Sequence, residues 1–234
     1  MADYLTFPRG LLKPKAERWN LVGGALSGGT AISGATQTSS LSGGPYWQAE
    51  LSGMWMRTAE HVKVWRALEA LLDQGVATMI VPMCEARYSP SGETNLVSHS
   101  DTDLFEPDSD YTTGAALHTV VGATALRATQ IVLDMNGRAL VGGEHFTLNH
   151  AAGGPRLYRV ARVVSVASEN YTCKIRPPLR AAVSNGASAD FANPRCLMKL
   201  SPGEAIGLSL EGNRFGEGAM NLTESFDTAA LSDA

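Results

Sequence analysis

The sequence has no long apolar run and no excess of positive charge, and these absences exclude several classes of protein. No stretch approaches the roughly 18 to 20 apolar residues with which a helix crosses a bilayer. The first residues, Met1-Ala2-Asp3-Tyr4-Leu5, lack the basic and apolar sections of a signal peptide. The formal net charge of −4 disfavours nucleic-acid binding. We therefore expect a protein kept in a cytoplasm, or in a particle assembled there, with neither a membrane nor a specific nucleic acid as partner.

Cysteine is also scarce. The 3 cysteines are far apart in the chain, and they are Cys84, Cys173 and Cys196. There is no Cys-x-x-Cys pair, and a cytoplasm keeps thiols reduced, so neither a disulfide framework nor a zinc site is indicated. We expect all three to be buried as small apolar residues.

The motifs that catalysis and cofactor binding require are missing. The glycine-rich stretch 23–30 lacks the lysine with which a phosphate loop reaches a nucleotide, and it favours a structural turn. Neither a nucleophile elbow nor a His-Glu-x-x-His pair occurs. Glu144, His145 and His150 are candidate metal ligands, but His145 alternates with Phe146 in an expected strand, where structural histidines are commoner. We expect no catalytic residue, no cofactor, no metal ligand and no enzymatic activity.

A carboxylate-rich run lies in a polar stretch from Ser89 to about Gly114. Its acidic residues are Asp101, Asp103, Glu106, Asp108 and Asp110. Calcium takes about six to eight oxygen ligands, some of which these side chains could supply, but the regular spacing and closing glutamate of an EF-hand are absent. We predict a long exposed loop that binds no ion strongly, and loops of this length are usually functional or disordered.

The first third contains the one clear helix, predicted over residues 58–74. Thr58 is a suitable N-cap, and Glu60 places a carboxylate in the first turn. Apolar residues then recur at three- and four-residue spacing, as Val62, Trp65, Leu68, Leu71 and Leu72. Gly75 ends the helix, and strands are predicted over 46–54 and 77–81.

All 4 tryptophans, Trp19, Trp47, Trp55 and Trp65, fall in the same third of the chain. They could form a platform on which sugars stack. Trp47 and Trp65, however, lie on the apolar faces of the predicted strand and helix, so we favour a core role.

From about residue 115 the pattern changes to short strands separated by glycine-containing turns. Such strands are expected near residues 118–121, 130–133, 145–148, 157–160 and 171–175, and later near 197–200, 206–210 and 219–222. Short strands with this punctuation are typical of a small barrel or sandwich. The sequence therefore predicts a mainly β protein with one helix.

The order of these elements resembles a family of small tail proteins found in siphophages and gene-transfer-agent-like particles. In the first half the resemblance lies in Trp47-Gln48-Ala49-Glu50-Leu51, in residues 54–57 leading into Ala59-Glu60, in Trp65-Arg66-Ala67-Leu68 and in Leu71-Leu72. In the second half it lies in residues 124–133 and 140–148, in Tyr158-Arg159-Val160 and in Ile175-Arg176-Pro177-Pro178-Leu179-Arg180. These motifs are structural, and the family's glycines are missing from the acidic stretch.

The resemblance implies a distal tail protein, a structural subunit that joins the tail tube to the tip or baseplate of a virion tail assembled in the bacterial cytoplasm. It implies a tail-tube-like β-sandwich with one α-helix over residues 1–114 and 197–234, and an inserted small β-barrel over 115–196. It also implies a homo-oligomer, a hexameric ring, whose partners are the tail tube protein and the tip or hub proteins.

Two other non-enzymatic functions stay open. A tail tube subunit would stack into open polymers, whereas a closed ring needs heterologous contacts whose rotation closes. A carbohydrate-binding tail module would use the barrel or the tryptophans. An enzyme, such as a hydrolase, has no residue constellation in its favour.

Overall fold

The computed structural model describes residues 4–40, 43–84, 89–90, 118–151, 153–204, 206, 208–211 and 215–226. Within these residues the protein is mainly β, with 50% in strands, 9% helical, a single α-helix and a nearly closed six-stranded sheet. This confirms the predicted fold class. The chain divides into unit 1, residues 1–84, 151–156 and 195–234, and unit 2, residues 85–150 and 157–194.

Unit 1 is built around a seven-stranded sheet that combines strands from both ends of the chain. Its main path runs β1-β6-β13-β15-β5-β2, and β14 pairs with β15. The strands are β1 (Leu5–Thr6), β2 (Ala16–Val22), β5 (Tyr46–Met56), β6 (Met79–Pro82), β13 (Arg195–Leu200), β14 (Ser209–Glu211) and β15 (Phe215–Glu224). Every pairing is antiparallel except that of β1 with β6. The late strands β13 and β15 lie in the middle, so the early strands cannot form this sheet alone.

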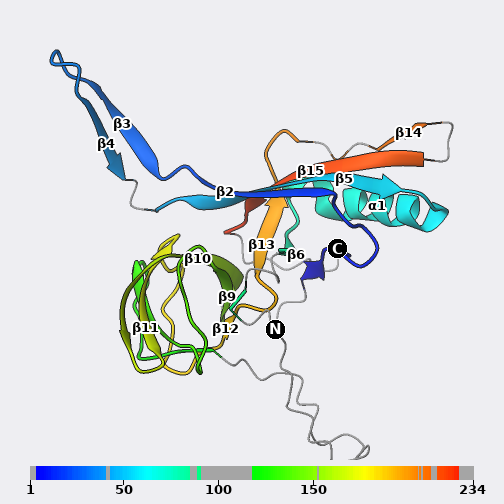
Figure 1. The fold of residues 1–234 in the computed structure, drawn as a ribbon. Coiled ribbons are helices and arrows are strands. Elements are labelled where there is room, and N and C mark those ends of the chain that lie inside the picture. Colours follow the sequence, from blue (N-terminus) through cyan, green and yellow to red (C-terminus); the bar gives the residue numbers. More distant parts are fainter. Residues whose placement is uncertain are drawn as a thin grey trace, which may run out of the picture. The chain divides into compact units, whose positions relative to one another are not determined.

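The helix α1 (Ala59–Leu72) lies against this sheet in unit 1 (Figure 1). The Thr58 hydroxyl accepts a hydrogen bond from the His61 backbone N–H at 3.3 Å, which caps the first turn as predicted. Trp65, Leu68 and Leu72 are buried, but Leu71 is 45% exposed. The prediction that Leu71 joins the buried stripe is therefore wrong. Consecutive residues of an α-helix lie about 100° apart around its axis, so Leu71 points away from the face that buries Leu72.

The helix ends through a left-handed backbone. Asp73 at the C-cap has φ 39°, and a short 3-10 turn, Asp73–Gly75, follows. Gly75 has φ +99°, and a Cβ there would lie 3.0 Å from the Leu200 carbonyl oxygen. Glycine is thus required by both conformation and space.

The central contact of helix and sheet is that of Trp65 with Gly218 of β15. Trp65 has no exposed surface, and a Cβ on Gly218 would lie 2.7 Å from the indole ring. The missing side chain therefore makes room for the largest side chain of α1. Trp47, on β5, is also fully buried and meets Trp19 edge-on, with ring centroids 6.3 Å apart.

Unit 1 also contains a buried ion pair. Arg156 and Glu224 have side chains 4% and 0% exposed, with Nη1 and Oε1 3.7 Å apart. Glu224 also accepts a hydrogen bond from the Trp47 backbone N–H at 3.1 Å, and Arg156 donates to the Ser225 carbonyl. Each charge has a polar partner, as a buried ion requires.

A second, two-stranded sheet follows β2. It consists of β3 (Ala25–Thr30) and β4 (Thr36–Ser40), which pair antiparallel and extend beyond the end of β2 in Figure 1. Every residue of β3 is exposed, and so is the apolar Ile32 in the connecting turn.

Unit 2 is the nearly closed six-stranded sheet, in the order β12-β9-β10-β11-β8-β7. Its strands are β7 (Thr119–Val120), β8 (Gln130–Asp134), β9 (His145–His150), β10 (Gly154–Ala167), β11 (Asn170–Arg176) and β12 (Ala189–Asp190). The two end strands approach each other: the Val120 N–H donates to the Ala187 carbonyl at 2.8 Å and the Ala189 N–H to the His118 carbonyl at 2.9 Å. These bonds bring the sheet close to a barrel, which leaves little free edge.

The interior of unit 2 is aromatic and aliphatic. Phe146 stacks on Phe191 with centroids 5.0 Å apart, and Tyr158 lies 5.7 Å from Phe146. The aliphatic part includes Val120, Ile131, Leu133, Leu148, Val160, Ile175 and Leu179.

The ranges of the two units differ from those predicted for the domains. The first three residues of β10, 154–156, belong to unit 1, whereas the predicted barrel over 115–196 includes them. The predicted boundary at 114/115 lies outside the described residues. The sequence gives no sign that one strand changes unit along its length.

Candidate functional site

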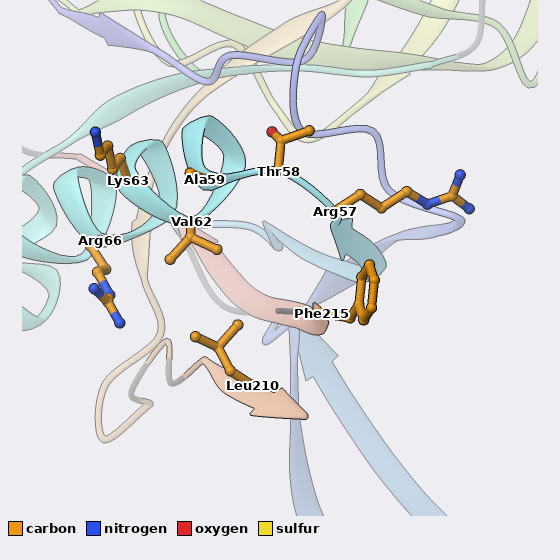
Figure 2. Close-up of a pocket in the computed structure, with 8 residues that line it drawn as sticks. All are labelled: Arg57, Thr58, Ala59, Val62, Lys63, Arg66, Leu210 and Phe215. Atoms are coloured by element: carbon orange, nitrogen blue, oxygen red, sulfur yellow. The ribbon is translucent and has the colours of Figure 1, made fainter. Parts of the chain in front are cut away.

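The candidate site is a groove of about 510 Å³ beside the first half of α1, here called the α1 groove. It is lined by Arg57, Thr58, Ala59, Val62, Lys63, Arg66, Leu210 and Phe215 (Figure 2). All eight belong to unit 1. One wall comes from the helix and the other from the hairpin of β14 and β15.

The helical wall follows from the period of α1. Ala59, Val62, Lys63 and Arg66 recur at i, i+3, i+4 and i+7, which places them on one face. The core residue Trp65 lies on another face, so the helix is buried on one side and lines the groove on another. In Figure 2, Val62 and Arg66 extend toward the side on which Leu210 lies.

The opposite wall is apolar. Leu210 lies on β14, and Phe215 begins β15, where its side chain is 55% exposed. Glu211 pairs with Phe215 in the register of β14 and β15, and Leu210 and Phe215 line the same groove as residues of α1. A large exposed aromatic ring beside a groove is typical of a binding surface.

The groove is electropositive. Arg57, Lys63 and Arg66 are exposed cations, and no carboxylate is among the described lining residues. Within the described part of the chain, neither Lys63 nor Arg66 forms an ion pair. Arg57 lies over the exposed ring of Trp55, 5.4 Å from its centroid. The arrangement can bind an anion that also carries apolar groups. Among the described lining residues, only Thr58 has a hydroxyl, and that hydroxyl caps the helix.

The candidate metal ligands of unit 2 have separate protein partners. The Glu144 carboxylate accepts hydrogen bonds from the Val141 and Gly142 backbone N–H groups, both at 2.8 Å. His150 Nε2 lies 2.8 Å from the Tyr158 hydroxyl. Within the described residues, no group of three or more His, Cys, Asp or Glu side chains could hold a metal ion.

His145 is a buried neutral histidine. Burial first, and then the Arg159 guanidinium, lower its pKa from 6.5 to about 3. Its Nε2 therefore accepts a hydrogen bond from Arg159 Nε, at 2.7 Å. Burial likewise lowers the pKa of His118, whose ring meets Phe191 edge-on at 5.3 Å. Both histidines pack as structural residues of unit 2.

The remaining sequence candidates are dispersed. The glycine-rich stretch 23–30 leads into strand β3 and includes it. A second strand, β4, follows it in place of the helix that a phosphate loop requires. Trp47 and Trp65 are buried, while Trp55 is 50% exposed. The acidic residues 101, 103, 106, 108 and 110 lie outside the described residues.

The prediction for the cysteines is wrong in one case. Cys173 and Cys196 are buried, and burial raises the pKa of Cys173 to about 11. Cys84 is exposed, and it lies two residues after strand β6 ends at Pro82.

Sequence reasoning did not identify the α1 groove. The i, i+3 spacing of Lys63 and Arg66 opposite the apolar stripe was a visible signal, but a solvated basic face has the same pattern. Only folding brings Leu210 and Phe215, which are far along the chain, to the same helix.

No protein-family model matches this chain, and no curated protein matches it significantly in sequence. Within the described residues, no helix is long and apolar enough to cross a membrane.

Proposed function

We propose that this chain is a non-enzymatic structural subunit of a bacteriophage tail, a distal tail protein that forms a ring between the tail tube and the tip or baseplate. The observation that carries the proposal is the order of strands in unit 1. Its sheet takes β1, β2, β5 and β6 from before unit 2, and β13, β14 and β15 from after it. A helix-bearing β unit interrupted by a small barrel-like unit is the architecture that the sequence resemblance implies.

The free edge of the sheet supports a role in assembly. In the described residues, β2 is a seven-residue strand at one end of the sheet. An edge of this length presents unpaired backbone groups, which proteins use for pairing with another chain.

The hairpin of β3 and β4 gives independent support. An isolated two-stranded hairpin is at best marginally stable in water. Here Leu26 is 53% exposed, and Ile32 is fully exposed at the turn. Apolar side chains on such an element gain stability when a neighbouring subunit covers them.

The test is the mass and shape of the purified full-length chain in solution. We expect light scattering to give about six times the 24.8 kDa chain mass, and electron microscopy to show closed six-fold rings. A monomer at all concentrations would contradict the proposal. Open polymers would favour a tail tube subunit, and a monomer retained on a polysaccharide column would favour a carbohydrate-binding module.

A hairpin-excised variant sharpens this test. Ala25 and Ser40 are register partners, so residues 25–40 can be replaced by a short Gly-Ser turn that joins neighbouring ends. We expect the variant to fold, as judged by tryptophan fluorescence, and to form fewer rings than the full chain at equal concentration. Unchanged ring formation would remove the hairpin from the assembly contacts.

A further inference from the structure

We propose that the α1 groove receives residues 101–110 of a neighbouring copy of the same chain, here called the acidic segment. This inference rests on the proposed ring, because it assigns one of the contacts between subunits. The distribution of charge, the residue pattern of the acidic segment and the geometry of ring closure all favour this contact.

The chain's negative charge is concentrated in one region. Six acidic residues and no lysine or arginine lie between Arg87 and Arg127. The other 17 of the 23 acidic residues are fewer than the 19 lysines and arginines. The rest of the chain is thus slightly positive, and it attracts the acidic segment over a distance of about a Debye length.

The acidic segment also matches the groove in pattern. It reads Asp-Thr-Asp-Leu-Phe-Glu-Pro-Asp-Ser-Asp, so that Leu104 and Phe105 are flanked by carboxylates on both sides. The groove has the complementary arrangement, with Val62, Leu210 and Phe215 as its apolar surface and cations at Arg57, Lys63 and Arg66. An arginine can bind a carboxylate through two parallel hydrogen bonds, and two phenylalanine rings can pack edge to face.

Ring geometry favours a contact between copies. A closed ring joins each subunit to the next through two different surfaces, and a groove that binds a remote segment is such a heterologous contact. The chain from residue 85 to residue 117, of which the structure describes Ser89 and Pro90, has an extended length on the order of 100 Å. This length suffices to reach an adjacent subunit.

A charge swap tests whether the α1 groove of one copy contacts the acidic segment of its neighbour. The groove variant carries Lys63→Glu and Arg66→Glu, and the segment variant carries Asp101→Lys and Asp103→Lys. We expect each variant alone to assemble at least ten-fold less well than the wild type, as measured by light scattering at low salt. We expect an equimolar mixture of the two to recover assembly, because each groove then meets a segment of opposite charge on its neighbour.

Control variants separate this effect from loss of folding and from net charge. Lys63 and Arg66 are exposed, so their substitution should leave the thermal unfolding temperature nearly unchanged. The matched control carries Arg162→Glu and Lys174→Glu, two exposed cations that face each other on β10 and β11 of unit 2. It changes the net charge equally and should assemble as the wild type does.

The outcomes are distinct. If the groove variant and the segment variant each assemble as well as the wild type, the inference is overturned while the proposed ring stands. If the mixture fails to recover assembly but a chain carrying all four substitutions assembles, the acidic segment binds its own chain, and the inference is again overturned.

A peptide experiment tests whether the α1 groove binds the acidic segment, even if the wild type forms no rings. A fluorescein-labelled peptide of residues 98–112 should bind the segment variant at low salt, because the basic segment of that variant does not compete for the groove. It should bind at least ten-fold more weakly to the chain that carries all four substitutions. A peptide with its five carboxylates replaced by amides should lose the binding. Equal binding to these two chains, or no binding to the segment variant, would overturn the inference whatever the oligomeric state.

Discussion

The contact between Trp65 and Gly218 allows a demanding test of how α1 packs on the sheet of unit 1. A Cβ on Gly218 would lie within 2.7 to 2.9 Å of three ring atoms of Trp65, so the wild-type protein has no room for an alanine there. The Gly218 backbone itself does not require glycine, because its φ lies outside the left-handed region. Removing the indole should therefore make Gly218→Ala acceptable.

The expected free energies follow from packing. Trp65→Ala should reduce the free energy of unfolding by about 3–5 kcal/mol, as for other buried tryptophans. The lower end is expected, because the Trp65 Nε1 hydrogen is buried with no hydrogen-bond partner among the described residues, and removing the indole removes that cost. Gly218→Ala should cost about 1–3 kcal/mol by overpacking in the wild type. In the Trp65→Ala background it should be neutral or stabilising, because alanine also restricts the unfolded chain by about 0.4–1 kcal/mol.

Urea denaturation followed by tryptophan fluorescence is the appropriate assay, because all 4 tryptophans belong to unit 1 and three remain in the variant. The two single variants and the double variant complete a double-mutant cycle. A Gly218→Ala cost that is equal in both backgrounds within about 0.5 kcal/mol would refute the packing argument. A Trp65→Ala loss below about 1 kcal/mol would show that the buried stripe faces elsewhere.

Three further predictions use other buried or exposed groups. Glu224→Gln should reduce the free energy of unfolding of unit 1 by about 3–5 kcal/mol. The change removes the carboxylate that pairs with Arg156, and it weakens the acceptor of the Trp47 N–H. A loss below about 1 kcal/mol in the same urea denaturation would contradict this. The pKa of His145 is about 3 in the folded protein and 6.5 in the unfolded chain, so the unfolded chain binds more protons between these pH values. The stability of unit 2 should therefore fall as pH decreases from 6.5. In thermal unfolding by circular dichroism, His145→Gln should show a smaller fall, and equal falls would refute the assignment. Ellman's reagent should label Cys84 rapidly in the native protein and the two buried cysteines only after unfolding; rapid labelling of a second thiol would contradict the packing.

Several features of this protein are local, and the sequence by itself determined them. Thr58 and the spacing of Trp65, Leu68 and Leu72 predict α1 to within two residues at each end, because capping and helical period depend only on neighbours along the chain. Glycine-containing turns and short apolar runs likewise predict a mainly β protein with a barrel-like part.

Tertiary structure alone decided which strands became partners. The sequence pattern favours a strand near residues 219–222, but it does not show that β15 lies between β13 and β5. It also places Arg156 within the predicted barrel, whereas this side chain pairs with Glu224 in unit 1. Strand pairing and buried ion pairs join residues far apart in the chain, so their partners are set by the whole core.

The α1 groove shows the same division. The sequence contains a helix with a basic face and a separate acidic segment, and both can be read locally. Leu210 and Phe215 become part of the site only because the β14–β15 hairpin returns beside α1, about 150 residues later in the chain. A binding surface depends on such long-range packing, because each of its walls alone has the pattern of an ordinary solvent-exposed element.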